Sequence, residues 1–190
     1  MPFKSAQFIT SVVGEVPILQ DGKAQVAFIG RSNVGKSSVI NSLANNGKLA
    51  FASPTPGRTQ TVNIYLVNKS FYLVDLPGYG FAKGSHEHRD KIMELVHWYL
   101  QRPAGAGQTV VLIVDAKVGP QENDLKMAQL LAANDRHVII IANKIDKLKP
   151  TEAQKAVAAI RKSFQEAEAV IPYSATEKIG VGQLVKALTV

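Results

Sequence analysis

Residues 25–37 read QVAFIGRSNVGKS, an apolar run followed by a glycine-bounded loop. Residues 25–30 are apolar up to a final glycine, which predicts a buried strand. Residues 30–37 match G-x-x-x-x-G-K-[ST], in which glycine lets backbone N–H groups approach a polyphosphate closely. Residues 36–45 predict the helix whose N-terminus then points at the phosphates. Strand, loop and helix in this order predict a P-loop nucleotide-binding protein.

The rest of the chain alternates between strands and helices. Residues 61–67 and 71–76 are rich in β-formers and separated by three turn residues, which predicts an antiparallel pair. Thr151 is the expected N-cap of a helix that follows Pro150. Further strands are expected at 109–115, 137–143 and 169–173, and helices at 89–100, 121–133, 151–165 and 181–188. Apolar strands that alternate with helices predict a mainly parallel sheet covered on both faces.

The composition excludes several classes of protein. The 190-residue chain has no cysteine, which rules out disulfides, thiol catalysis and Cys-based zinc sites. Its apolar runs fall far short of the roughly 20 residues of a membrane helix, and residues 1–10 show no secretory signal. We therefore expect a soluble, cytoplasmic monomer with no membrane or DNA partner. The net charge is +7, and no acidic residue occurs between Asp21 and Asp75, which favours an anionic ligand there.

Two motifs point to a magnesium-bound nucleotide. In the phosphate loop, Lys36 supplies a charge to the β- and γ-phosphates and Ser37 supplies a hydroxyl to Mg²⁺. Residues 75–78 read DLPG at the end of an apolar strand. Asp75 can hold Mg²⁺ through water there, and the Gly78 N–H can meet the γ-phosphate. An aspartate at a strand end is also a common cap, but its position after the phosphate loop favours the metal role.

A third motif selects the base. Residues 143–146 read NKID at the end of another apolar strand. The Asp146 carboxylate can accept from both guanine ring donors, N1–H and the 2-amino group, and adenine lacks the matching pair. Asn143 either bonds the base or ties the loops together, and the Lys144 stem covers the base plane. Ser174 and Ala175, after the last strand, offer a backbone N–H to the guanine O6.

We therefore expect an α/β fold of the P-loop NTPase class, a Ras-like G domain. Its central sheet should have about six mainly parallel strands, one antiparallel edge strand, and helices on both faces. Residues 4–13 are a weak candidate for one more extended segment. No repeat or linker is visible, so a single domain should span residues 1–190, with an N-terminal extension over about 1–22 and the GTPase core over about 23–190.

A first switch requires a threonine that reaches Mg²⁺ and the γ-phosphate when GTP is bound. The acid-free loop contains Thr55, Thr59 and Thr61. We expect Thr59, in the sequence Gly57-Arg58-Thr59, to serve this role. Thr61 is the second choice because it begins the predicted strand.

The segments GRSNVGKS, PGRTQT and DLPGYGFAK together resemble the EngB (YihA/YsxC) family of bacterial ribosome-biogenesis GTPases, among the TrmE-Era-EngA-EngB-septin-like GTPases. The likeness covers nearly the whole chain, and DLPGYGFAK is its most family-specific part. It implies GTP and GDP binding with Mg²⁺, a role in assembly of the large ribosomal subunit and a link to normal septation. A precursor of that subunit or its rRNA is then the expected partner. The family often has Thr at the position of Asn143, although Asn is usual in GTPases generally.

By this resemblance, Ser37 and Thr59 are direct Mg²⁺ ligands, with Asp75 as the third metal residue, and Lys36, Thr59 and Gly78 act on the γ-phosphate. The implied nucleotide site comprises Gly30, Arg31, Ser32, Asn33, Val34, Gly35, Lys36, Ser37, Gly57, Arg58, Thr59, Gln60, Thr61, Asp75, Leu76, Pro77, Gly78, Asn143, Lys144, Ile145, Asp146, Tyr173, Ser174 and Ala175.

The residue after D-x-x-G bears on the rate of hydrolysis. Ras-like proteins place a glutamine there to orient the attacking water, and this chain has Tyr79. A phenol is a poor substitute, so we expect slow hydrolysis and a partner that supplies the missing group, with Gln60 as a candidate stand-in. The alternative is a nucleotide-dependent RNA- or ribosome-binding module with negligible hydrolysis. A P-loop kinase is disfavoured by NKID.

Asn33 leaves two interpretations open. It resembles a phosphate-loop asparagine that ligates a catalytic K⁺ ion in some related GTPases. It can equally be a residue that only shapes the loop through local hydrogen bonds.

Overall fold

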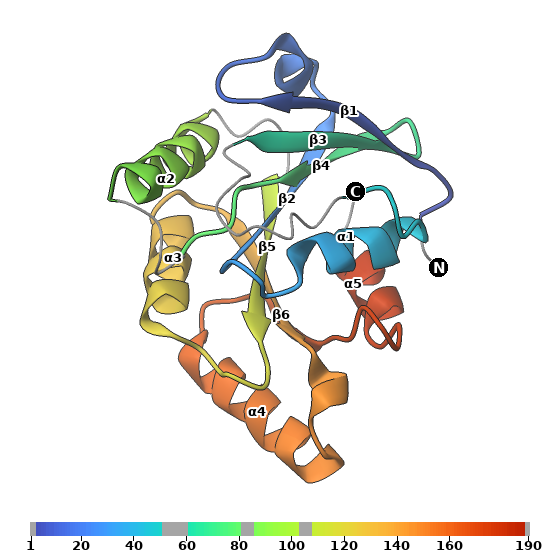
Figure 1. The fold of residues 1–190 in the computed structure, drawn as a ribbon, viewed down its shortest axis with the longest axis vertical. Helices are drawn as coiled ribbons and strands as arrows, with labels where there is room; N and C mark the ends of the chain where they lie inside the picture. Colours follow the sequence, from blue (N-terminus) through green and yellow to red (C-terminus); the bar gives the residue numbers. More distant parts are fainter. Residues whose placement is uncertain (1–2, 51–60, 81–85, 103–107, 189–190) are drawn as a thin grey trace.

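The computed structural model describes residues 3–50, 61–80, 86–102 and 108–188. Its sheet has seven strands in the order β1-β3-β4-β2-β5-β6-β7 (Figure 1). The bounds of the strands are β1 Ala6–Val12, β2 Ala24–Gly30, β3 Val62–Val67, β4 Phe71–Asp75, β5 Gln108–Asp115, β6 His137–Asn143 and β7 Ala169–Pro172. Strands β4, β2, β5, β6 and β7 run parallel, and β1 and β3 are joined to that block by antiparallel pairings. The expected α/β fold is confirmed.

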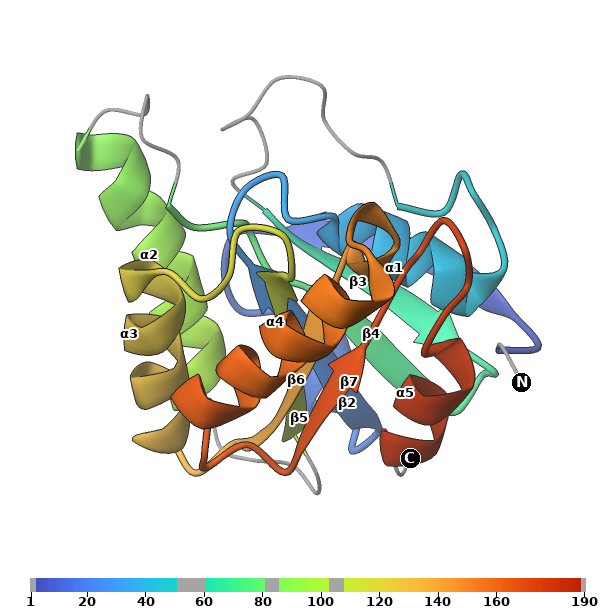
Figure 2. The same cartoon turned by 90° about the horizontal axis from the view of Figure 1, so that it is seen from below.

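Within the described residues, five α-helices lie on the two faces of this sheet (Figures 1 and 2). They are α1 Lys36–Ala44, α2 His86–Gln101, α3 Glu122–Ala132, α4 Pro150–Ser163 and α5 Val181–Ala187, with short 3₁₀ turns at Pro17–Gln20 and Ile145–Lys147. One apolar core joins the sheet to α2, α3 and α4, and a second joins it to α1 and α5. None of these described helices is long and apolar enough to cross a bilayer.

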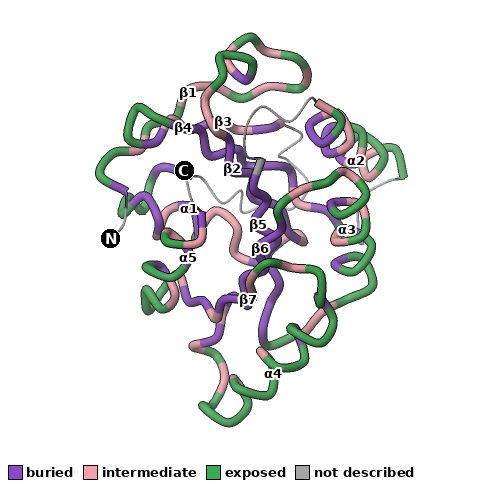
Figure 3. The backbone as a smooth tube through the Cα atoms, turned by 180° about the vertical axis from the view of Figure 1, so that it is seen from behind, coloured by how far each residue is buried: buried purple, intermediate pink, exposed green. Residues whose placement is uncertain are grey.

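Burial explains why the central strands are apolar at every position. In β2, Val26 and Phe28 pack into the core with α1, whereas Ala27 and Ile29 pack into the core on the opposite face. Alternate side chains of a strand point to opposite faces, so a strand covered on both sides needs apolar residues throughout. Figure 3 shows the result as a buried central sheet with helices exposed on their outer sides.

The sheet differs from expectation at one edge. The strand expected at 61–67 was predicted to be the antiparallel edge, but β1 pairs with it and becomes the seventh strand. The turn between β3 and β4 holds this addition, because the Asn68 side-chain oxygen accepts the N–H groups of Lys4 (2.9 Å) and Ser5 (3.1 Å). Asn68 and Lys69 both have positive φ (48° and 57°), the conformation of a tight hairpin turn.

The start of α4 also differs from expectation. Thr151 was predicted to be its N-cap, but the helix begins one residue earlier, at Pro150, and Lys149 is the N-cap. Proline is favoured in the first turn because its missing N–H and fixed φ cost nothing there. The Glu152 carboxylate, in the first turn of the helix, accepts the Lys149 N–H at 3.0 Å and so satisfies the N–H of the N-cap residue.

Candidate nucleotide-binding site

The predicted motifs converge at one edge of the sheet. The phosphate loop follows β2, the DLPG segment begins at the end of β4, NKID begins at the end of β6, and Ser174 comes two residues after β7. All four strands are parallel, so these ends lie at the same edge. Strand β2 has β4 on one side and β5 on the other, which makes its end the point where the strand order reverses. Ligands of open α/β sheets bind at such points.

Two glycines of the phosphate loop leave no room for a side chain. A Cβ on Gly30 would lie 2.8 Å from Val34 Cγ1 and 2.9 Å from the Ile113 oxygen. Gly35 has φ +99°, and a Cβ there would lie 2.5 Å from Asn143 Nδ2. The loop therefore packs directly against the NKID segment. Its close backbone course is the feature that a polyphosphate site needs.

Asn33 helps to shape this loop. It has φ +65°, in the left-handed region that asparagine tolerates better than most residues. This conformation gives the loop-shaping interpretation of Asn33 a physical basis. No contact in the described part of the chain bears on a potassium site.

The cation and the carboxylate predicted for the phosphates and the metal lie together. The Lys36 ammonium contacts the Asp75 carboxylate, and their side chains are 12% and 5% exposed. Ser37 follows Lys36 in the first turn of α1. Mg²⁺ in nucleotide sites takes one or two protein oxygens and completes its shell with phosphate oxygens and water. A hydroxyl and a carboxylate at this edge fit that requirement.

Backbone hydrogen bonds join the phosphate loop to the DLPG segment. The Ser32 N–H donates to the Tyr79 oxygen at 2.9 Å, and the Tyr79 N–H donates to the Gly30 oxygen at 3.3 Å. A Cβ on Gly78 would lie 3.3 Å from both Ser32 N and Ser32 Cα. Gly78 is therefore held against the phosphate loop, where its N–H is expected to meet the γ-phosphate.

At the other end of the site, Asn143 ties the loops together. Its Nδ2 donates to the Val34 oxygen at 2.9 Å, which is one of the two roles expected for it. Its Oδ1 is buried and accepts no hydrogen bond from any residue that the structure describes. An orphaned polar atom at this position suits a site that a polar ligand completes.

Lys144 bridges three segments. Its Nζ donates to the Asn33 oxygen at 2.9 Å and pairs with Asp115 Oδ2 at 2.7 Å. The stem therefore runs from the end of β6 toward the phosphate loop, and its expected place over a base stays a prediction. Asp115 was not among the predicted residues. The sequence did hold a signal for it, because Asp115 ends β5 at the same edge of the sheet as the other motifs.

Asp146 is prepared to accept hydrogen bonds as an ionised carboxylate. A hydrogen bond from the Ser174 side chain is the main cause that lowers the pKa of Asp146, and Lys147, at 3.2 Å, adds to the effect. The Ser174 N–H is already donated to the Ile179 oxygen at 3.1 Å. Ala175 therefore remains as the source of the backbone N–H expected at guanine O6.

Several predicted site residues are part of the core rather than of an open surface. The side chains of Leu76, Ile145 and Tyr173 are buried among apolar neighbours. The Tyr173 hydroxyl lies 2.5 Å from the Ser42 hydroxyl of α1, and its backbone oxygen accepts the Ile145 N–H at 3.1 Å. These residues position the loops through packing and backbone contacts.

Tyr79 and Arg31 both point toward α3. The Tyr79 hydroxyl donates to Asp124 Oδ1 at 2.8 Å, and Arg31 Nε donates to both oxygens of Asp124, at 3.2 and 3.0 Å. Tyr79 is only 4% exposed, and burial raises its pKa far above the ordinary value, so the phenol stays protonated. Asp124 was missed in the sequence because nothing near it in the chain indicates its distant partners.

The first switch falls mostly outside the described residues. Gly57, Arg58, Thr59 and Gln60 are in this part of the chain, and their predicted roles stay predictions. Thr61, the second choice, directly precedes β3, and its hydroxyl lies 3.4 Å from Asn63 Oδ1.

Comparison with known protein families agrees with this geometry. Residues 25–144 match the family model described as 50S ribosome-binding GTPase, and residues 100–190 match that of the elongation factor Tu GTP binding domain. The chain is 40% identical to the probable GTP-binding protein EngB of Acholeplasma laidlawii, over 97% of this chain and 96% of that protein. It is 44% identical to the EngB protein of Clostridium beijerinckii, over 87% and 83% of the two chains.

Solved structures show the same fold. The crystal structure of a probable GTP-binding protein EngB superposes with a TM-score of 0.70 at 28% identity, covering 86% of this chain and 95% of that one. Era in complex with MgGDPNP and nucleotides 1506–1542 of 16S ribosomal RNA also gives a TM-score of 0.70, at 25% identity, over 87% of this chain and 55% of that chain. With its motifs gathered at one sheet edge and this degree of likeness, the chain belongs to the EngB family of GTP-binding proteins and carries a GTPase domain.

Proposed function

We propose that the chain binds GTP with Mg²⁺, hydrolyses it slowly to GDP, and acts as a switch in assembly of the large ribosomal subunit. The observation that carries this proposal is the convergence of three segments at one sheet edge. The phosphate loop, the Asp75–Gly78 segment and the NKID segment are held together there by hydrogen bonds such as the one from Asn143 to the Val34 oxygen.

In this account each residue has a defined task in hydrolysis. Lys36 and the amides of the phosphate loop neutralise the charge that develops on the phosphates. Ser37, Thr59 and Asp75 would hold Mg²⁺, which would offset the negative charge of the phosphates. The Gly78 N–H would contact the γ-phosphate, and Asp146 would select guanine.

Slow turnover follows from the orientation of Tyr79. Tyr79 stands at the sequence position where Ras-like proteins have a water-orienting glutamine. Its side chain is buried, however, and its hydroxyl donates a hydrogen bond to Asp124. It therefore offers no group to an attacking water, and a partner or Gln60 must supply one. We assign Asn33 to loop shape, so turnover should be equal in K⁺ and Na⁺.

The proposed partner is the large ribosomal subunit precursor or its rRNA, and the link to septation would be indirect. Support comes from the matched family description, which names 50S ribosome binding, and from the net charge of +7. Era, a structural relative, was crystallised with a segment of ribosomal RNA.

A second candidate is a nucleotide-dependent ribosome-binding module that scarcely hydrolyses GTP. The buried Tyr79 is the specific observation that favours it. Single-turnover phosphate release with and without ribosomal particles separates the two candidates. Release that rises when particles are added supports the switch, and release near the uncatalysed rate in both cases supports the binding module.

Binding to the particle is tested by sedimentation of the GTP-loaded, GDP-loaded and nucleotide-free chain with separated ribosomal subunits. The proposal expects co-sedimentation with the large subunit in the GTP form and much less in the GDP form. Equal binding in all three forms would contradict a switch.

A further inference from the structure

A single buried carboxylate joins two segments of the nucleotide site. Asp124 is 0% exposed in the first turn of α3. Its oxygens accept hydrogen bonds from Arg31 Nε, from the Tyr79 hydroxyl and from the Gln121 N–H, the last at 2.9 Å. A buried charge is tolerated when it is paired and fully hydrogen-bonded, as this one is. We call these three side chains the Arg31–Asp124–Tyr79 network.

The network lies directly behind the expected γ-phosphate contact. Arg31 belongs to the phosphate loop, and Tyr79 immediately follows Gly78. The two segments also form a parallel β-bridge that pairs Arg31 with Tyr79, in which the Tyr79 backbone bonds the residues on either side of Arg31, Gly30 and Ser32. Asp124 therefore fixes, from the α3 side, the spacing of the loop and of the peptide that carries the Gly78 N–H.

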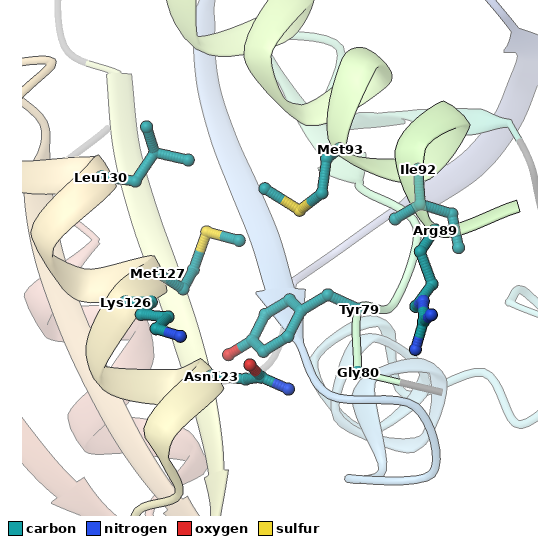
Figure 4. A pocket seen from close by; sticks show the side chains of 9 residues that line it. All are labelled: Tyr79, Gly80, Arg89, Ile92, Met93, Asn123, Lys126, Met127 and Leu130. Carbon is teal, nitrogen blue, oxygen red and sulfur yellow. The ribbon is translucent and has the colours of Figure 1, made fainter. Parts of the chain in front are cut away.

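Packing alone does not fix the Tyr79 side chain. Figure 4 shows its ring extending toward α3 beside a pocket between α2 and α3. This pocket has a volume of about 230 Å³, and Ile92, Met93, Met127 and Leu130 line its apolar part. Because space remains on this side of the ring, the hydrogen bond to Asp124 is the contact that specifies its orientation. A fixed Tyr79 in turn restrains Gly78.

We propose that Asp124 and the Tyr79 hydroxyl are positioning residues that hold the Gly78 N–H ready for the γ-phosphate, and so strengthen GTP binding relative to GDP binding. This inference rests on the proposed function, in which Gly78 contacts the γ-phosphate. GDP has no γ-phosphate, so its binding does not use this contact. Without the hydrogen bond between Tyr79 and Asp124, the Gly78 peptide must be ordered when the nucleotide binds, and this free-energy cost falls on GTP binding alone.

The test is Tyr79→Phe, which keeps the ring and removes the hydroxyl. Affinities for GDP and for a non-hydrolysable GTP analogue are measured with Mg²⁺ by calorimetry. The affinity for the GTP analogue should fall about three- to tenfold, the size expected for one buried hydrogen bond, while GDP affinity stays within about twofold.

A matched control is Tyr99→Phe. The Tyr99 hydroxyl is also buried and donates to Gln25 Oε1 at 3.2 Å, on α2 and away from the site. This variant should lower the melting temperature but leave both affinities unchanged. If Tyr79→Phe changed neither affinity, weakened both ligands equally or tightened the GTP analogue, the positioning role would be overturned.

Asp124→Asn provides a second route to the same point. It keeps the shape but turns one acceptor oxygen into a donor, so it should weaken the GTP analogue at least as much as Tyr79→Phe does. In the double variant the two losses should be less than additive, because Asp124→Asn removes the charge that strengthens the Tyr79 hydrogen bond, and part of that bond's energy is already lost in the single variant. Additive losses would contradict a shared role. Failure of the wild-type chain to bind guanine nucleotides at all would instead refute the proposed function.

Discussion

The base end and the phosphate end of the site are built differently. At the base end, Asp146 is bonded to Ser174, and both are in short segments that follow neighbouring strands. At the phosphate end, two ion pairs join segments of the chain, Lys36 with Asp75 and Arg31 with Asp124, and the carboxylate of each pair is buried. The carboxylate expected to read the base is therefore held mainly by a neutral hydroxyl, whereas the cation expected to bind the phosphates is paired with a carboxylate of the chain itself.

The largest expected effect tests the base end alone. Asp146→Asn replaces a double acceptor with an amide that presents a donor to the guanine 2-amino group. Affinity for GTP should fall by about a hundredfold or more, and affinity for XTP, which carries a 2-oxo group, should rise. Equilibrium binding of both nucleotides measures this. Unchanged GTP affinity would show that Asp146 does not read the base.

A substitution at the phosphate end should lower the affinity for every nucleotide, whichever base it carries. Lys36→Ala removes the phosphate cation and leaves the Asp75 carboxylate buried without its partner. We expect affinity to fall by about ten- to a hundredfold for GTP, GDP and XTP alike, from the loss of a charged hydrogen bond. Competition binding with the three nucleotides checks this. A loss of affinity for only one of the nucleotides would contradict the separate roles of the base end and the phosphate end.

Gly35 lies where the two ends touch, so its substitution should disturb both. Gly35→Ala places a Cβ 2.5 Å from Asn143 Nδ2 at φ +99°. Unfolding free energy should fall by about 1–3 kcal/mol, and nucleotide affinity should fall as well. The control Gly182→Ala is in α5, with nothing within 4 Å of its added Cβ. That change should raise stability by about 0.5–1 kcal/mol and leave binding unaltered. Denaturant unfolding measures both, and equal effects would contradict the geometry.

The smallest effect concerns the local support of Asp146. Ser174→Ala removes the hydrogen bond that is the main cause of its lowered pKa. The pKa of Asp146 in the folded chain is below its value in the unfolded chain. The stability that the ionised carboxylate contributes, and the nucleotide binding that needs it, are therefore present above the unfolded pKa and are lost as pH falls. In the variant this loss should therefore begin at a higher pH than in the wild type. GDP affinity measured from pH 7 downward tests the shift, and superimposable profiles would refute it.

Contacts local in sequence were predictable, and long-range contacts were not. GRSNVGKS and NKID are contiguous motifs whose residue types follow from the chemistry of phosphate and guanine, so they could be located without a structure. The Arg31–Asp124 and Tyr79–Asp124 contacts span 93 and 45 residues, and no local pattern announces such pairings. The orientation of Tyr79 could not be predicted either, although its poor suitability for orienting water could.

The sheet shows the same limit. Central strands are apolar throughout because both faces are covered, and this pattern identified them. Strand β1 has an irregular register between Phe8 and Thr10 and exposed positions on its outer side, which weakens the signal. Its pairing depends on β3 and on the Asn68 turn, more than 50 residues away in the chain.

A guanine-nucleotide switch site at this edge of the sheet is tested by titration of the wild-type chain with a GTP analogue, GDP and ATP in the presence of Mg²⁺. We expect saturable binding of both guanine nucleotides and at least about a hundredfold weaker binding of ATP. Binding of ATP as tight as that of the GTP analogue would contradict it.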